Sequence, residues 1–122
     1  MHTDGLGLHM AGNMANESKM RRHKMGAAIL TDHGDWILGF NKHKTHPRFK
    51  TRSIHAEMDA LLMCARNGRA TKRATIYVAR RHRDGTPAIA KPCDVCMQLL
   101  HHAGVERAVW TTDTGHEEFI LG

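Results

Sequence analysis

Four side chains in two short segments are suited to binding a metal ion and moving a proton. His55 and Glu57 are separated by one residue, and Cys93 and Cys96 lie three positions apart. One imidazole and two thiolates are three zinc ligands, and a zinc ion with three protein ligands keeps its fourth tetrahedral position open for water. Glu57 is close enough in sequence to reach that water without ligating the metal, which suits a residue that transfers protons. The pattern therefore predicts a catalytic zinc site, with His55, Cys93 and Cys96 as ligands and Glu57 as acid and base.

Each pair is expected at the beginning of a helix. After Ile54, apolar residues recur with helical spacing as far as Asn67 and Gly68, a sequence that favours a helix end. A second apolar face follows Pro92, which the first turn of a helix tolerates, and ends at Gly104. Free N–H groups and the helix dipole at such a position favour thiolate over thiol, and cysteines at i and i+3 face the same way. Two helix starts that face each other would therefore bring the three ligands to one ion.

The other apolar segments predict a sheet around these helices. Strands are expected at 26–31, 36–40, 75–79 and 105–112, a helical stripe at 6–17, and one more turn of helix in the tail, 113–122. The first two strands form an antiparallel hairpin through the turn at 32–35. The later alternation of helix and strand favours an α/β layered sheet, in which a right-handed crossover places 75–79 and 105–112 side by side and parallel.

Length and composition limit the class of protein. A chain of 122 residues has room for one domain. No apolar run approaches the roughly 18 residues that span a bilayer, and the N-terminus lacks a secretory pattern, so a cytoplasmic location and no membrane partner are expected. Three cysteines, an odd number, do not suggest a disulfide framework. The net charge of +6 favours anionic partners, either phosphate-bearing small molecules or nucleic acid.

The C-x-x-C pair has other interpretations. It also occurs in redox sites and in structural zinc sites, and both alternatives stay open at this point. A non-catalytic zinc module that binds nucleic acid is a third, although a structural site has no use for Glu57. Cys64 has no partner motif and lies on the apolar side of its expected helix, which indicates a core residue.

The motifs resemble those of the cytidine and deoxycytidylate deaminase superfamily, whose signature is H-x-E followed by P-C-x-x-C. The resemblance rests on the segments 26–29 (GAAI), 39–41 (GFN), 53–61 (SIHAEMDAL), 92–96 (PCDVC) and 102–110 (HAGVERAVW). It implies that 1–122 is a single zinc-dependent deaminase domain, with 1–16 a first helix or a partly disordered segment. The implied fold has three layers, a mixed five-stranded sheet flanked by helices.

The resemblance also implies functional residues. By this match Asn41 contacts the sugar or base, the amide of Ala56 holds the pyrimidine carbonyl and Pro92 lies near the amino group. Zinc is the implied cofactor and a homo-oligomer the implied assembly. The chain departs from the deoxycytidylate deaminases at Asp59, where they usually carry Asn.

The substrate class has two interpretations. The first is a free cytosine nucleoside or nucleotide (cytidine, deoxycytidine or dCMP) that is hydrolysed to uracil and ammonia. In support, a loop without acidic residues joins a strand to the zinc helix, and its cations are either phosphate contacts or merely solvated. These cations are Lys42, Lys44, Arg48, Lys50 and Arg52. The alternative is a polynucleotide deaminase for single-stranded DNA cytosine or tRNA adenosine, with basic clusters at 21–24, 69–73 and 80–83 as a backbone track. Only six aromatic residues are present to stack on bases, which weighs against it.

Overall fold

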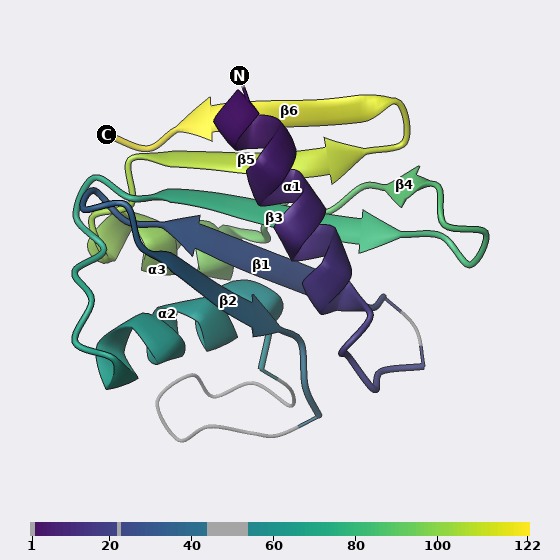
Figure 1. Ribbon diagram of the computed structural model, residues 1–122, viewed down its shortest axis with the longest axis horizontal. Helices are drawn as coiled ribbons and strands as arrows, with labels where there is room; N and C mark the ends of the chain where they lie inside the picture. The colour runs from purple at the N-terminus through teal and green to yellow at the C-terminus, as the bar shows by residue number, and fades with distance from the viewer. Residues whose placement is uncertain (1, 22, 44–53) are drawn as a thin grey trace.

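A computed structural model describes residues 2–21, 23–43 and 54–122, and it shows a mixed β-sheet between helices (Figure 1). The elements are α1 (His2–Ala15), β1 (Met25–Leu30), β2 (Trp36–Phe40), α2 (Ala56–Arg66), β3 (Thr75–Arg81), β4 (Pro87–Ala88), α3 (Asp94–His102), β5 (Arg107–Thr112) and β6 (Gly115–Ile120). Within these ranges no helix has both the length and the apolar character needed to cross a bilayer. The cytoplasmic location stays a prediction.

The sheet has the order β2-β1-β3-β5-β6, and the short strand β4 pairs with β3 beside this path. Only the β3–β5 pair is parallel, whereas all other neighbours are antiparallel. The α/β class, the first hairpin and the parallel pair predicted from the sequence are therefore confirmed. The count of five strands corresponds to the path alone, and β4 is the sixth strand.

The helices form one layer on each face of the sheet, because side chains alternate along the strands. In Figure 1, α1 crosses one face while α2 and α3 lie behind the other. The core is divided in the same way. Facing α2 and α3 are Ala27, Ile29, Ile76, Val78, Ala108 and Trp110, whereas Ala28, Tyr77, Ala79 and Val109 face α1.

Helix α1 contains glycines that weaken its helical propensity, and its packing explains them. A Cβ atom on Gly7 would overlap the ring of Tyr77, and one on Gly26 of β1 would overlap the carbonyl of Ala11. Each of these two contacts has a glycine on one side, on the helix at Gly7 and on the sheet at Gly26, so that helix and sheet approach closely. The helix predicted within 6–17 is present and begins four residues earlier, at His2.

The tail of the chain differs from the prediction. Instead of a turn of helix, Gly115–Ile120 forms β6, an antiparallel edge strand that pairs with β5 from Thr112↔Gly115 to Arg107↔Ile120. Its residues are all exposed, so no apolar alternation marked the strand in the sequence. The strand forms because β5 would otherwise leave a row of backbone N–H and C=O groups unpaired at the edge of the sheet.

At one end of the strands β1 begins, and β2 and β3 end. We call this end of the sheet the site edge; it is distinct from the outer strands β2 and β6. Strand pairing aligns Met25 with Arg80 and Gly26 with Phe40 at this edge. The same edge continues into the start of α2 through the bridge between Lys42 and Ile54. The start of α3 follows β4, which pairs with the last residues of β3. Both helices that carry the zinc-type motifs therefore begin at one edge of the sheet.

Candidate metal centre

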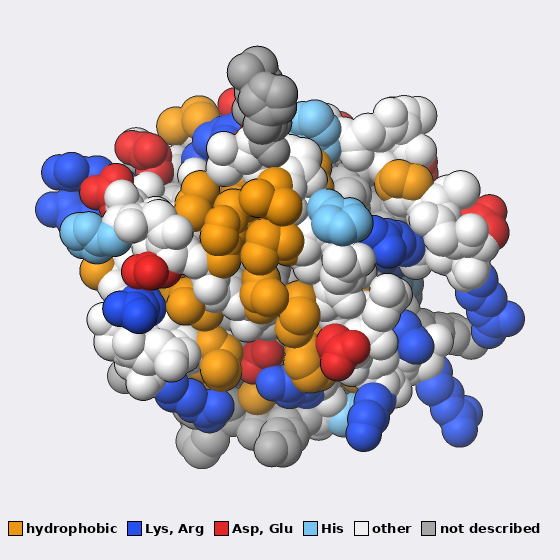
Figure 2. Space-filling view, viewed as in Figure 1, with side chains coloured by type: hydrophobic (Ala, Val, Ile, Leu, Met, Phe, Trp, Pro, Cys, Tyr) orange, Lys and Arg blue, Asp and Glu red, His pale blue; other side chains and the backbone are white. Residues whose placement is uncertain are grey.

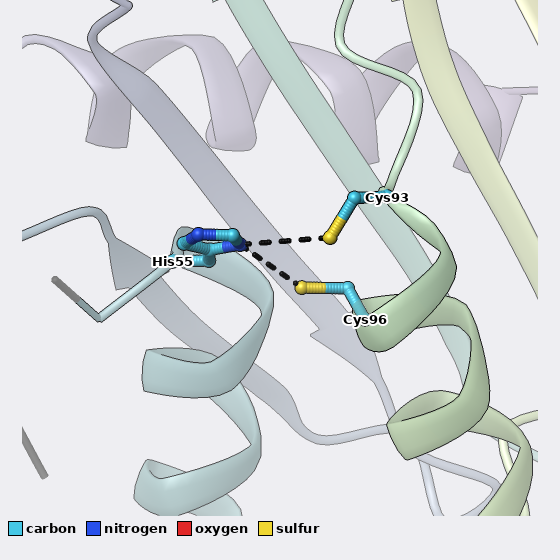
Figure 3. Close-up of side chains that lie close together, drawn as sticks. All are labelled: His55, Cys93 and Cys96. Atoms are coloured by element: carbon cyan, nitrogen blue, oxygen red, sulfur yellow. Dashed lines mark hydrogen bonds between the residues drawn. The ribbon is translucent and has the colours of Figure 1, made fainter. Parts of the chain in front are cut away.

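His55, Cys93 and Cys96 lie together at the site edge, although 38 residues separate the first two in sequence. His55 is the N-cap residue of α2 and Cys93 the N-cap residue of α3, whereas Cys96 lies within the first turn of α3. Figure 3 shows the imidazole and both sulfurs pointing toward one another from the two helix starts. The Nδ1 atom of His55 lies 3.2 Å from Sγ of Cys96 and 3.9 Å from Sγ of Cys93.

These separations suit a tetrahedral zinc ion. Bonds of about 2.3 Å to sulfur and about 2.0 Å to nitrogen place tetrahedral donors about 3.5 to 3.8 Å apart. The three donor atoms all lie within 4.8 Å of one another, so small side-chain adjustments suffice. One imidazole and two sulfurs also match the donor types that zinc prefers. The donor set therefore fits a zinc ion with one coordination position left over. Among the described residues no fourth His, Cys, Asp or Glu joins the group.

Glu57 lies in the first turn of α2 and is 3% exposed. Its Oε1 atom is buried and has no hydrogen-bond partner among the described residues. Burial raises the pKa of Glu57 to about 6, while its own backbone N–H and the neighbouring Cys96 lower it. A buried carboxylate oxygen without a partner is costly, and such groups concentrate at functional sites. Its position beside Cys96 lets it exchange a proton with a molecule held at the cluster.

The ionisation of Cys96 differs from the expectation that a position at a helix start favours its thiolate. The pKa of Cys96 is raised above its usual range, first because the thiol is buried and then because Glu57 and Cys93 lie beside it. The helix dipole is therefore too weak to ionise this sulfur alone. A divalent cation would supply the missing stabilisation, since coordination deprotonates a thiol outright. Cys96 is thus a buried thiol whose ionisation a bound metal ion would favour.

The ligands rest on an apolar support. Cys96 packs with Ile54 and Met58 in a small buried cluster, against which Leu99 also lies. One turn along α2, Asp59 is 4% exposed and binds the end of β2. Its Oδ2 accepts a hydrogen bond from Phe40 N–H at 3.1 Å, and its Oδ1 lies 2.9 Å from Nζ of Lys42. The carboxylate thereby fixes the helix that carries His55 to the sheet.

The three expected substrate contacts occupy two different environments. Asn41 is buried, and its side chain joins two chain segments: Oδ1 accepts from Met25 N–H at 2.9 Å and Nδ2 donates to the carbonyl of His23 at 2.6 Å. It also lines a cavity of about 530 Å³ beside Lys42 and Ile54. Ala56 and Pro92 are buried next to the metal-type ligands. The substrate roles of all three stay predictions.

Lys42 is the one predicted phosphate contact within the described residues, because Lys44, Arg48, Lys50 and Arg52 lie outside them. Its ammonium pairs with Asp59 and lies 4.5 Å from the centre of the Phe40 ring. Its charge is therefore already partly neutralised.

Cys64 is 1% exposed, and burial raises the pKa of its thiol to about 11. It is a core residue, as predicted. The positioning role of Asp59 was missed, although the sequence held a signal: an acidic residue one helical turn after His55, on the side of the helix where apolar residues were expected.

The chain is similar in sequence to known proteins. The family model of the cytidine and deoxycytidylate deaminase zinc-binding region matches residues 1–112. Deoxycytidylate deaminases of Enterobacteria phages T2 and T4 are each 24% identical over 99 residues, which is 80% of this chain. The match covers 47% and 46% of those two proteins, so the chain spans about half the length of the curated relatives it matches.

Solved structures share the fold. A cytidine deaminase from Burkholderia pseudomallei superposes with a TM-score of 0.78 at 19% identity, covering 97% of this chain and 92% of that one. A dCMP deaminase from cyanophage S-TIM5 gives a TM-score of 0.68 at 22% identity, covering 89% and 82%. These similarities establish the architecture around the His55 cluster.

Proposed function

The chain belongs to the cytidine and deoxycytidylate deaminase zinc-binding family, and on that premise we propose that it is a zinc-dependent hydrolytic deaminase. Its substrate is the cytosine of a free nucleoside or nucleotide (cytidine, deoxycytidine or dCMP). Water replaces the amino group at C4, so that cytosine and water yield uracil and ammonia. The observation that carries the proposal is the buried Oε1 of Glu57, which has no partner among the described residues and lies beside the His55, Cys93 and Cys96 cluster.

The proposal gives each residue a task. His55, Cys93 and Cys96 hold the zinc ion. When bound, zinc supplies Lewis acidity, which lowers the pKa of water from its value in bulk to near neutrality. Glu57 would take one proton from the attacking water and return it to the nitrogen that leaves, and a positioned acid–base group of this kind contributes about 10²- to 10⁴-fold to a rate. The N–H of Ala56, at the positive end of α2, holds the pyrimidine carbonyl.

Two comparisons support a nucleotide among the substrates. The phage T2 relative is named a deoxycytidylate deaminase, and the cyanophage S-TIM5 enzyme has been solved in complex with dCMP and dUMP. A net charge of +6 also favours a substrate that carries phosphate. We expect a homo-oligomer, which light scattering would reveal as a mass above the 13.7 kDa of one chain.

A panel assay with one variant tests the proposal. The zinc-loaded protein is incubated with cytosine, cytidine, deoxycytidine, their monophosphates and single-stranded DNA and RNA, and uracil or inosine is measured. Glu57→Ala should lower turnover about 10²- to 10⁴-fold and leave the zinc content unchanged. Glu117→Ala, on exposed β6, is the matched control and should behave as the parent.

Three results would contradict the proposal. No product from any substrate would refute deamination. Turnover of Glu57→Ala within tenfold of the parent would refute the proton-transfer role. Loss of both zinc and fold in that variant would show that the carboxylate is structural.

A polynucleotide deaminase, acting on single-stranded DNA cytosine or tRNA adenosine, is the second candidate. Cations near the end of β3, at the site edge, favour it, because they form no ion pair with a carboxylate within the described residues. The two candidates differ in salt dependence. Between 50 and 200 mM NaCl, the kcat/KM for a mononucleotide should fall only as far as the weakening of about one or two phosphate contacts requires. The affinity for a polynucleotide, which makes many such contacts, should fall much more steeply.

A further inference from the structure

A second cavity, of about 700 Å³, opens where the end of α1, the segment after it and the end of β3 meet. Five Lys and Arg side chains line it: Arg21, Lys24, Arg80, Arg81 and Arg83. His23 and His82 also line it. Figure 2 shows Lys and Arg side chains gathered on the right and lower right of this face, beyond the end of α1. We call this site the basic cavity.

Strand pairing explains why two basic segments far apart in sequence converge. Met25 pairs with Arg80 at the site edge, so the residues before β1 lie beside those at the end of β3. Arg81 lies against α1, where a Cβ atom on Gly12 would overlap its guanidinium group. Arg80 donates from Nη1 to the carbonyl of Ile89 at 3.4 Å. The fold thus holds part of the basic cavity in place.

The cations of the basic cavity are not neutralised by the protein. No Asp or Glu is among the described residues that line it. Across the part of the chain that the structure describes, none of the five Lys and Arg side chains forms an ion pair with a carboxylate. The nearby Asp84 instead accepts hydrogen bonds from the N–H and hydroxyl of Thr86, at 3.0 and 2.6 Å. Asp113 pairs with His82, at 3.1 Å.

A second basic cluster lies near the β1–β2 turn, at the end of the strands opposite to the site edge (here the opposite edge). Its cations, unlike those of the basic cavity, pair with carboxylates. Arg69 lies 3.6 Å from Asp35, and Arg73 lies 3.9 Å from Asp32. That cluster is compensated by acidic residues of the β1–β2 turn, as is usual for surface cations. Grouping five uncompensated cations around one cavity costs electrostatic free energy unless an anion binds between them.

We propose that the basic cavity binds a run of two or more phosphate groups, as found in a polynucleotide backbone or in a nucleoside polyphosphate. Arg and Lys recognise phosphate oxygens through charge-assisted hydrogen bonds, and five such donors exceed what one phosphate needs. The volume lies in the range of about 300 to 1,000 Å³ that is typical of small-ligand sites. Among the described residues no Phe, Tyr or Trp lines the cavity, so binding there depends on phosphate and not on stacking of a base.

This proposal adds a binding site to the proposed enzyme and does not depend on deamination, although a polynucleotide bound there would also serve the second candidate function. The basic cavity lies on the α1 side of the sheet, whereas the metal-type cluster lies at the starts of α2 and α3, on the other side. Binding is therefore measured without turnover. Glu57→Ala should bind phosphate probes as the parent does, so that failure of either proposal leaves the other standing.

The experiment compares two triple variants of the full chain that lose the same charges. Arg21→Gln/Lys24→Gln/Arg83→Gln removes three exposed cations of the basic cavity, and Arg69→Gln/Lys72→Gln/Arg73→Gln removes three exposed cations at the opposite edge. The probes are inorganic tripolyphosphate, followed by calorimetry, and a fluorescein-labelled single-stranded oligothymidylate, followed by anisotropy. Melting temperatures verify that both variants fold.

The parent should bind at least one probe at 50 mM NaCl, a concentration in the range of about 50 to 200 mM over which phosphate contacts weaken strongly. The basic-cavity variant should bind at least about tenfold more weakly, and the slope of log affinity against log salt for the oligonucleotide should fall by about 2, from three lost contacts at about 0.7 each. The opposite-edge variant should stay within about threefold of the parent. Binding of the oligonucleotide alone would identify a polynucleotide backbone, whereas binding of tripolyphosphate would identify a free polyphosphate. Equal weakening in the two variants, or no binding of either probe by the parent, would overturn the proposal.

Discussion

Asp4 anchors α1 to the sheet, and its removal should destabilise the protein in a pH-dependent way. Its carboxylate is held by Arg107 at the start of β5, whose Nη1 donates to Oδ1 at 2.8 Å and whose Nη2 donates to Oδ2. The hydroxyl of Tyr77 donates to Oδ1 as well, also at 2.8 Å. The side chains of Asp4 and Arg107 are only 14% and 24% exposed, so water screens the pair weakly.

The magnitude follows from the pKa. The hydrogen bonds from Arg107, chiefly, and then that from Tyr77 hold the pKa of Asp4 at about 2, against burial, which acts in the opposite direction. The ordinary value is 3.8. Since one pKa unit corresponds to about 1.4 kcal/mol, the ionised carboxylate stabilises the fold by about 2 kcal/mol at neutral pH. Because the folded-state pKa is depressed, this stabilisation is present above pH 4 and is lost as the pH falls toward 2, with about half lost by pH 3.

Urea unfolding of Asp4→Asn, followed by far-UV circular dichroism, measures the effect. The variant should lose about 2 kcal/mol relative to the parent at pH 7 and about 1 kcal/mol at pH 3. Asp113→Asn is the control, because Asp113 is exposed and its pair with His82 is exposed too, so its loss should be small at both pH values. The expected decrease of this loss between pH 7 and pH 3 is about 1 kcal/mol. A loss for Asp4→Asn below about 0.5 kcal/mol at pH 7, or a loss that is equal at the two pH values, would contradict the stabilising role of the ionised carboxylate.

Three further changes test the support of the metal site. Asp59→Asn should lower the free energy of unfolding by about 1 to 2 kcal/mol, because it removes the ion pair with the partly exposed Lys42. A double-mutant cycle with Lys42→Met should give a coupling energy of about 1 kcal/mol, and a coupling near zero would contradict the pairing. Gly39→Ala should destabilise the protein by about 1 to 3 kcal/mol and weaken zinc binding, because the new methyl group would crowd the backbone of α2. Gly5→Ala is the control: it lies in open space on α1 and should stabilise the protein by about 0.5 to 1 kcal/mol. Equal effects of the two substitutions would argue against the close contact at Gly39. Removal of zinc by a chelator should abolish activity and lower the melting temperature while the far-UV spectrum persists, since an apolar cluster supports Cys96; loss of the spectrum would mean that the metal, and not the packing, assembles the site.

The metal-type cluster could be predicted from the sequence because it depends on local spacing. His55 and Glu57 share the start of one helix, and Cys93 and Cys96 share the start of another, so two short motifs determine four side chains. That the two starts face each other follows from a common topology, in which helices begin at the edge where strands end. The parallel pairing of β3 with β5 was predictable for the same reason.

Features that depend on long-range register could not be predicted. β6 is exposed along its whole length, and it is a strand only because β5 offers an unpaired edge. The glycines of α1 argue against a helix until Tyr77 is found against Gly7. The basic clusters looked alike in sequence, yet pairing of Met25 with Arg80 brings two of them together, while acidic turn residues neutralise the third.

The site edge also bears on the choice among free substrates. The N-terminal ends of α2 and α3 lie there, and each contributes a partial positive charge. On the other side of the sheet at the same edge, the basic cavity adds five cations that form no ion pair with a carboxylate within the described residues. Several positive sources on one edge raise the local concentration of an anionic ligand and its association rate, whereas they do little for a neutral one. Within the proposed substrates, dCMP therefore gains from this field and cytidine does not. We therefore expect kcat/KM to be higher for dCMP than for deoxycytidine, and we expect this difference to shrink as salt screens the field. A difference that does not change with salt would instead assign the discrimination to short-range contacts of the pocket.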